Sequence, residues 1–420
     1  MPRQHCNPTP QTPTSARTFQ SRPQIAIWFR LALAWACLVT PARGQELTEA
    51  EIKRHVRRTS PEVLAAQSEV RLLQAREAVE AHPNPELSFT REQLLGAPDA
   101  AEDTLALSIP LDLSGRRGAR SSLARAGSRS AASRATRLGS AVTHSALRIF
   151  YRGLAAKKRA DLARTLVARL EEAARVSKSR LSQGSASGYD VSRIELDADL
   201  SRSTLVSAEA AERRAVLQLA SLLGRQAEGL TLSGSLRAVA IVGSPPQERP
   251  SLTHQRAALE AARQAQSRAA RAWVPMLALD AGVRRAVGDE TRYGYVAGLH
   301  VELPLFSRGR AVSAEANALA DHSGAQLRAL EARAKSARAV ASLELSNYLA
   351  EVERFRRATA PHAERTLRAA RSAYREGQIG VTELLDAERA ALRVSQRSVE
   401  LELRAKLAEL DLRAARGEFE

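Results

Sequence analysis

The sequence contains one pattern written twice, and this duplication limits the possible folds more than any other feature. The segment SIPLDLSGR, which includes Pro110, recurs as ELPLFSRGR, which includes Pro304. The segment around Gly184 recurs around Gly377. The offsets are 194 and 193 residues, so the two pairs follow the same period. Such a period predicts one structural unit used twice rather than two or three unrelated compact domains.

The first 44 residues have the three parts of a secretory signal peptide. A basic region without acids, 1–24, precedes an apolar run, 25–39, and a small-residue site at 42–44. A membrane anchor is the alternative, but the run is shorter than the ~20 residues of a spanning helix and Arg30 interrupts it. The residues before Cys37 form a poor lipidation motif. We therefore expect a mature chain that starts near Gln45.

Loss of this segment changes the composition. Both cysteines, Cys6 and Cys37, lie in it, which excludes disulfides and thiolate metal sites from the mature chain. It also carries five of the 63 basic residues and none of the 46 acidic ones, so the mature net charge is +12. The remaining charges alternate in sign along predicted helices. Because no basic block with interspersed aromatics is present, nucleic acid is not an expected partner.

Each repeat is predicted to hold two strands followed by a long helical hairpin. Apolar and polar residues alternate in the strands, so that Leu105, Leu107 and Ile109 share one face. Proline is absent between Leu111 and Ser244, which favours long helices. We expect the first repeat to cover 45–243, with strands at 86–92 and 103–111 and a hairpin at 115–224. We expect the second repeat to cover 244–420, with strands at 276–286 and 293–304 and a hairpin at 308–417.

The fold class is therefore mainly α with a small β part, and the strands allow two interpretations. They are either hairpins that cap a soluble helical body, or strands of a transmembrane β-barrel. A lone hairpin is marginally stable in water, whereas apolar-out, polar-in strands of about ten residues are typical of membrane barrels. Four strands cannot close a barrel, so this interpretation requires several copies of the chain.

The signal peptide, the duplication, the strand pairs and the long hairpins together resemble the TolC-like outer membrane factor family, over essentially all of 45–420. The segments PNPELSF at 83–89 and LSIPLDLSGRRGAR at 107–120 are most similar to its cobalt–zinc–cadmium heavy-metal efflux branch. The resemblance implies a homotrimer in the cell outer membrane, with a twelve-strand barrel continued by a periplasmic α-helical tunnel. It implies a passive duct, not an enzyme and without cofactors. Its expected partners are outer-membrane lipid, a periplasmic membrane fusion protein and an inner-membrane efflux pump of the resistance-nodulation-division type, with metal cations as cargo.

The resemblance also implies functional residues. Those expected to contact the adaptor at the hairpin tips are Gly184, Ser187, Gly377 and Gly380. Those expected at the periplasmic aperture, where rings of acids would attract cations, are Asp190, Tyr374, Glu383 and Asp386. For Asp190 and Glu383 the alternative is that they only favour helix N-termini. Those expected on the channel lumen are Asp280, His300 and Glu302, either contacting cations or simply wetting the wall.

Several features depart from the family or bear on other function classes. Ile379 stands where the family gate has an arginine, which argues against a strong salt-bridged lock between Tyr374 and Asp190. Pro361 predicts a kink in the second hairpin. No two mature histidines have the i, i+3 or i+4 spacing of a metal site. A periplasmic coiled-coil adaptor or scaffold is the main alternative, but it would need one hairpin and a lipoyl-like module. A helical surface protein leaves the strands without a role, and an enzyme is disfavoured because catalytic motifs are absent.

Overall fold

The fold is described from a computed structural model for residues 45–80, 84–93, 101–111, 115–241, 248–287, 290–302 and 309–419. The predicted signal peptide, most of the predicted boundary at 243–250, and residues 303–304 of the last predicted strand lie outside these ranges. Glu46–Glu420 forms one compact unit. The chain is mainly helical with one small antiparallel sheet, as the sequence predicts.

The two halves share one order of elements. The first half is α3 (Pro61–Glu80), β2 (Glu86–Gln93), β3 (Ala101–Leu111), α4 (Arg116–Ser182) and α5 (Gly188–Leu223). The second half is α6 (Pro250–Ala270), β5 (Met276–Val287), β6 (Arg292–Glu302), α7 (Arg310–Arg354), a π-helix (Phe355–Thr359), α8 (Ala360–Arg375) and α9 (Val381–Ala415). The first half adds α2 (Glu49–Thr59) and the short paired strands β1 (Gln45–Leu47) and β4 (Leu230–Leu232), which the sequence did not lead us to expect.

The long helices follow from composition and end where the sequence changes. The first hairpin begins with α4, whose 67 residues place its two ends about 100 Å apart at ~1.5 Å per residue. The turn after it contains Gly184 at φ +73°, and the turn after α8 contains Gly377 at φ +75°. Such left-handed backbone favours glycine. The π-helix lies directly before Pro361 and confirms the predicted break in the second hairpin.

The four main strands form one antiparallel sheet in the order β2-β3-β5-β6. Its register aligns the apolar residues in rows: Leu107 lies opposite Leu87 on one side and opposite Ala281 on the other. The contact between β3 and β5 joins the two halves of the chain, with four helical or extended segments between them in sequence. The strand pairs predicted separately thus become one continuous sheet, with β2 and β6 as its edges.

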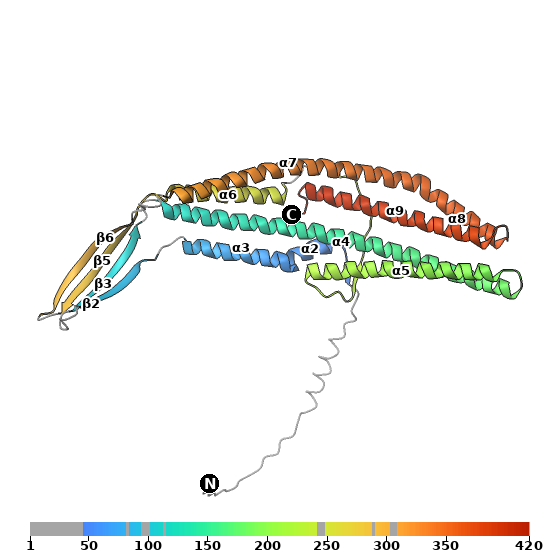
Figure 1. Cartoon of the computed structure of the whole chain (residues 1–420), viewed down its shortest axis with the longest axis horizontal. Coiled ribbons are helices and arrows are strands. Elements are labelled where there is room, and N and C mark those ends of the chain that lie inside the picture. Colours follow the sequence, from blue (N-terminus) through green and yellow to red (C-terminus); the bar gives the residue numbers. More distant parts are fainter. Residues whose placement is uncertain are drawn as a thin grey trace, which may run out of the picture. The chain divides into compact units, whose positions relative to one another are not determined.

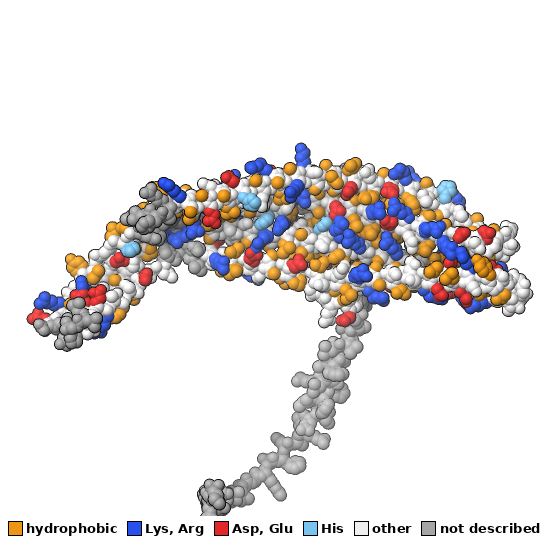
Figure 2. Space-filling view, viewed as in Figure 1, with side chains coloured by type: hydrophobic (Ala, Val, Ile, Leu, Met, Phe, Trp, Pro, Cys, Tyr) orange, Lys and Arg blue, Asp and Glu red, His pale blue; other side chains and the backbone are white. Residues whose placement is uncertain are grey.

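The helices lie side by side (Figure 1). The largest apolar core draws residues from both halves of the chain. This core combines residues of α2, α4, α5, α9, β4 and the C-terminal Phe419, and its largest fully buried side chain is Phe150. On the face shown in Figure 2, Lys and Arg side chains are interspersed with Asp and Glu over the helices. Many of these charges are paired and exposed, so water screens each pair and the pairs add little to stability.

Candidate functional site

The first hairpin tip is organised by a capping box. Ser187 is the N-cap of α5, and its hydroxyl accepts the backbone N–H of Asp190 at 3.1 Å. In return, the Asp190 carboxylate accepts the Ser187 backbone N–H at 3.3 Å and the Ser187 hydroxyl at 2.8 Å. Reciprocal bonds of this kind satisfy backbone donors that a helix start leaves open. Asp190 therefore has a local structural role at the start of α5.

The second hairpin tip has glycine at the same point instead. Gly380 is the N-cap of α9 and supplies no side chain, and Glu383 lies one turn later. A Cβ at position 380 would lie 2.9 Å from the Glu383 carboxylate, so this acid folds back over the tip. Glu383 and Asp386 are both exposed, and Asp386 lies 3.4 Å from Arg389. The tip acids are thus open to solvent in the single chain.

Tyr374 does not bind Asp190 in the described chain. Its ring packs against the apolar cluster that includes Ile194 and Leu385, and the Arg180 guanidinium lies 5.4 Å from the ring centroid. Tyr374 is therefore held between the hairpins by packing. No hydrogen bond joins it to Asp190 within the ranges described.

A buried ion pair close to the tips does join the two hairpins. Asp197 on α5 is 5% exposed, and its Oδ1 accepts a hydrogen bond from Arg389 Nη2 of α9 at 2.5 Å. Asp197 Oδ2 is buried and has no hydrogen-bond partner, so Arg389 is the main compensation for this carboxylate. In sequence these two residues look like ordinary helix-face charges, 192 positions apart, and no local pattern distinguishes them.

A second buried acid reinforces the same region. Glu388, one residue before Arg389, is 9% exposed and lies 2.6 Å from Arg371 of α8 and 3.9 Å from Arg169 of α4. Its partners come from both hairpins. We call Asp197, Arg389, Glu388, Arg371 and Arg169 the inter-hairpin ion cluster. It is the site that sequence reasoning missed.

The sheet has one apolar and one polar face. The apolar side chains are exposed in the single chain: Leu87 is 68% exposed, Phe89 66% and Leu299 63%. A row containing Arg91 and Asp103, 3.8 Å apart, ends this apolar face toward the β2–β3 connection. Soluble chains rarely leave such a continuous apolar surface uncovered.

The predicted lumen residues lie on the opposite, polar face. Asp280 is half-buried on β5 opposite Ser108 and Gly298, and His300 is exposed on β6 opposite Ala278. Glu302 ends β6, and its side chain is outside the described set. On the same face Glu102 and Arg284 form an ion pair. In the described ranges, no group of three His, Cys, Asp or Glu side chains is arranged to hold a metal ion.

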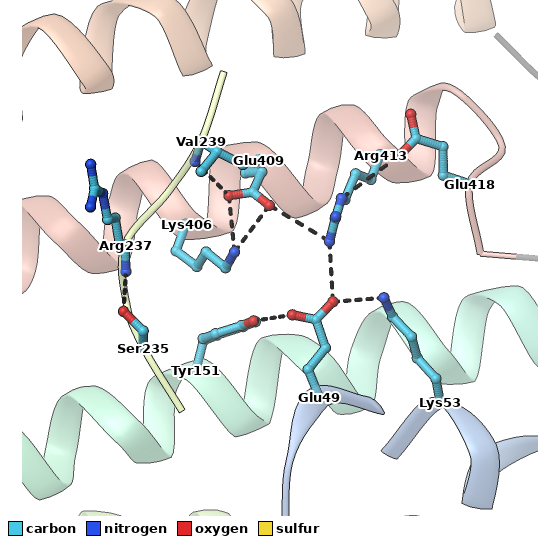
Figure 3. A network of polar contacts seen from close by, with 10 residues as sticks. All are labelled: Glu49, Lys53, Tyr151, Ser235, Arg237, Val239, Lys406, Glu409, Arg413 and Glu418. Atoms are coloured by element: carbon cyan, nitrogen blue, oxygen red, sulfur yellow. Dashed lines mark hydrogen bonds and ion pairs between the residues drawn. The ribbon is translucent and has the colours of Figure 1, made fainter. Parts of the chain in front are cut away.

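A buried polar network fixes the centre of the helical body (Figure 3). Glu409 of α9 is fully buried and accepts hydrogen bonds from Lys406 Nζ at 3.0 Å and from the Val239 backbone N–H at 3.0 Å. Nearby, Glu49 accepts hydrogen bonds from Tyr151 and from Arg413, the latter at 3.1 Å. Through these contacts α9 holds both the extended segment after α5 and the start of α2.

The network favours the ionised form of Glu49 and so lowers its pKa. Burial by itself raises the pKa, but hydrogen bonds from Lys53 and Tyr151 and the positive charges of Lys53 and Arg413 outweigh it and lower the pKa to about 2. Burial, together with the hydrogen bond to Glu49, raises the pKa of Tyr151. Glu49 is therefore ionised and Tyr151 neutral throughout the physiological range.

Every helix within the described ranges falls short of the combined length and hydropathy that a membrane span requires.

Comparison with known proteins agrees with this architecture. Residues 246–418 match the model of the family described as outer membrane efflux protein. A search of curated protein sequences finds no match. Among solved structures, the chain is similar to CusC (TM-score 0.76, 17% identity, 89% of this chain and 93% of that one). It is also similar to the outer-membrane channel OprN, with a TM-score of 0.75, 19% identity, and coverage of 88% of this chain and 89% of that one. A third similar structure is the open state of the Neisseria gonorrhoeae MtrE outer membrane channel, with a TM-score of 0.74, 17% identity, and coverage of 88% of each chain. The chain has the fold of these outer-membrane channel proteins.

Proposed function

We propose that this chain is the outer-membrane channel subunit of a tripartite export system and a member of the TolC-like family. Three copies pool their sheets into a twelve-strand barrel, and their helical hairpins continue as a tunnel through the periplasm. The observation that carries this proposal is the four-stranded sheet, which has an uncovered apolar face and two unpaired edges in one chain. Exposed edges and apolar faces are unfavourable in water, and barrel closure in a bilayer removes both.

The chain then acts as a passive duct rather than an enzyme. In this proposal 45–243 and 244–420 are its two structural repeats, and the inner-membrane pump supplies the energy for export. The hairpin tips at Gly184, Ser187, Gly377 and Gly380 contact the periplasmic adaptor. The sheet's polar face, with Asp280, His300 and Glu302, lines the lumen. The heavy-metal branch motifs favour metal cations as cargo.

Within the duct, we place the aperture at the tips. Glu383 and Asp386 are exposed one and two turns into α9, so three copies place six carboxylates around the axis. Such rings select cations. Asp190 and Tyr374 lie at the same level and support the tip through the capping box and through packing.

The test of the aperture is ion selectivity in a planar bilayer. Glu383→Gln/Asp386→Asn should lower the ratio of cation to anion permeability, measured from the reversal potential in a salt gradient. Glu364→Gln, an exposed acid on α8 outside the tip, is the matched control and should leave the ratio unchanged. An unchanged ratio in the tip variant would remove the aperture role from these acids.

The alternative, a periplasmic coiled-coil adaptor or scaffold, is less well supported. An adaptor needs one hairpin, whereas here the hairpin is duplicated and each copy follows a strand pair that joins a single sheet. Recovery of the protein as a soluble periplasmic monomer would favour this alternative over the duct.

A further inference from the structure

We propose that the junction between the sheet and the helices binds an anionic phospholipid through its headgroup phosphate. This inference rests on the proposed function, because it takes the apolar sheet face to lie in a bilayer. Three segments meet at the junction: the start of α4, the end of α6 and the start of α7. Arg271 Nη1 donates to the Gly115 carbonyl at 2.7 Å, and the Ser313 hydroxyl donates to the Ala269 carbonyl at 3.3 Å.

The three segments have an unusual charge. Positions 115–120, 268–275 and 309–314 contain no acidic residue, and their basic residues are Arg116, Arg117, Arg120, Arg268, Arg271 and Arg310. The acids nearest to the three segments in sequence are Asp112, Asp280 and Glu315. A duplicated Gly-Arg pair, at 115–116 and 309–310, supplies part of this charge in both repeats.

This charge opposes the local preference of the helices. Both α4 and α7 begin with arginine and have no acid in the first turn, although the positive end of a helix dipole favours acids there. Neither helix has a side-chain cap. A departure from a local rule that recurs in both repeats points to a functional demand. An external anion satisfies that demand.

A groove at the junction joins this charge to apolar surface. Its cavity volume is about 490 Å³, and Arg120 and Arg268 line it together with Leu123, Val312 and Leu319, with Glu315 as its one acid. Arg120 Nε is buried without a hydrogen-bond partner. Arg268 and Arg310 are exposed, and neither forms an ion pair with any described residue. Guanidinium groups beside an alkyl-lined groove match a phosphate beside an acyl chain.

The position of the groove identifies the phosphate as that of a lipid. The apolar face of β3 continues to Leu111, four residues before Gly115, so the arginines follow directly where the apolar surface ends. Trp273 lies between Arg271 and β5 and is 65% exposed, as expected of an aromatic side chain at the membrane interface. A basic cluster at this depth attracts anionic headgroups.

Trp273 also provides the assay, because the two other tryptophans, Trp28 and Trp35, lie in the predicted signal peptide. The purified protein is reconstituted into phosphatidylcholine vesicles doped with either brominated phosphatidylglycerol or brominated phosphatidylcholine, and Trp273→Phe defines the background. Bromine quenching of Trp273 gives the relative binding constant of the two lipids. We expect a preference for phosphatidylglycerol of about fivefold or more, the factor that one arginine contributes near an anionic surface.

The variants separate charge from fold. Arg120→Gln/Arg268→Gln/Arg310→Gln should bring the preference close to one, whereas the same three positions as lysine should retain most of it. The charge-matched control Arg213→Gln/Arg214→Gln/Arg328→Gln, at exposed positions elsewhere on the helices, should behave as the wild type.

Two outcomes overturn the inference and leave the duct intact. One is equal quenching by both lipids in the wild type, which is also the result if a second copy of the chain covers the groove. The other is an unchanged preference in the glutamine variant. Absence of quenching by either lipid is a different result, because it would remove the sheet from the bilayer and contradict the proposed function itself.

Discussion

Substitutions at the Asp197–Arg389 pair should be unequal in cost, because the two partners are buried to different degrees. Arg389→Gln leaves the Asp197 carboxylate 5% exposed and uncompensated, a change that costs about 3–5 kcal/mol. Asp197→Asn leaves an arginine that is 36% exposed and 3.4 Å from Asp386, so the guanidinium keeps both water and a partner. That loss resembles an exposed pair, about 1 kcal/mol.

The assay is native-state hydrogen exchange of the amides in 190–200 of α5, which measures the free energy of local opening. With 1.4 kcal/mol per factor of ten, Arg389→Gln should raise exchange about 100-fold or more and Asp197→Asn about fivefold. Lys178→Gln removes an exposed pair with Glu195 in the same hairpin and is the control, with an effect no larger than that of Asp197→Asn. Equal effects of the two substitutions at the pair, or a larger effect of Asp197→Asn, would refute this account of the inter-hairpin ion cluster.

Three further predictions concern stability and assembly. The pKa of Glu49 is about 2 in the folded chain and 4.5 in the unfolded chain. The ionised Glu49 side chain therefore contributes about 3 kcal/mol to the free energy of unfolding above pH ~4.5, and this contribution is lost as the pH falls toward 2. Glu49→Gln should remove this pH dependence in thermal melts. Lys406→Met leaves the buried Glu409 carboxylate with two partners, the Val239 backbone N–H and Arg413 at 3.6 Å, and should cost about 1–3 kcal/mol in denaturant unfolding. Adding Glu409→Leu should recover part of this loss, and no recovery would contradict a buried-charge penalty. Gly282→Val places a Cβ 2.4 Å from a β3 backbone oxygen and should abolish assembly in cross-linking, while Gly294→Ala, with open space around it, should assemble normally.

The sequence predicted those parts of the fold that depend on local pattern. Period-two alternation located the strands, proline-free stretches located the long helices, and Gly184 and Gly377 marked the turns. The strands β1 and β4 have three residues each, too few for a readable period, and they depend on the core. The helix α2 does carry local signals, a capping box of Thr48 and Glu51 and the buried pair Ile52 and Val56 four residues apart, which our sequence predictions did not include. The extended segment after α5 is held by its contacts with α9.

The site was predictable only in part. The tips and their acids could be located from the repeat, since a turn glycine and a following acid are local signals. The inter-hairpin ion cluster could not be located from the sequence, because Asp197 and Glu388 differ from neighbouring helix charges only in burial. Burial depends on how α5 and α9 pack, which is a tertiary property. The hydrogen bonds of Asp190 with Ser187 establish its capping role, whereas its role at the aperture stays a prediction.

The most direct test of the account is the oligomeric state of the protein extracted by mild detergent from the outer-membrane fraction and measured by native mass spectrometry. A pooled barrel requires three copies of one chain, because the four strands of one copy cannot close a barrel. Recovery of a single copy from the soluble periplasmic fraction, with none in the membrane, would contradict it.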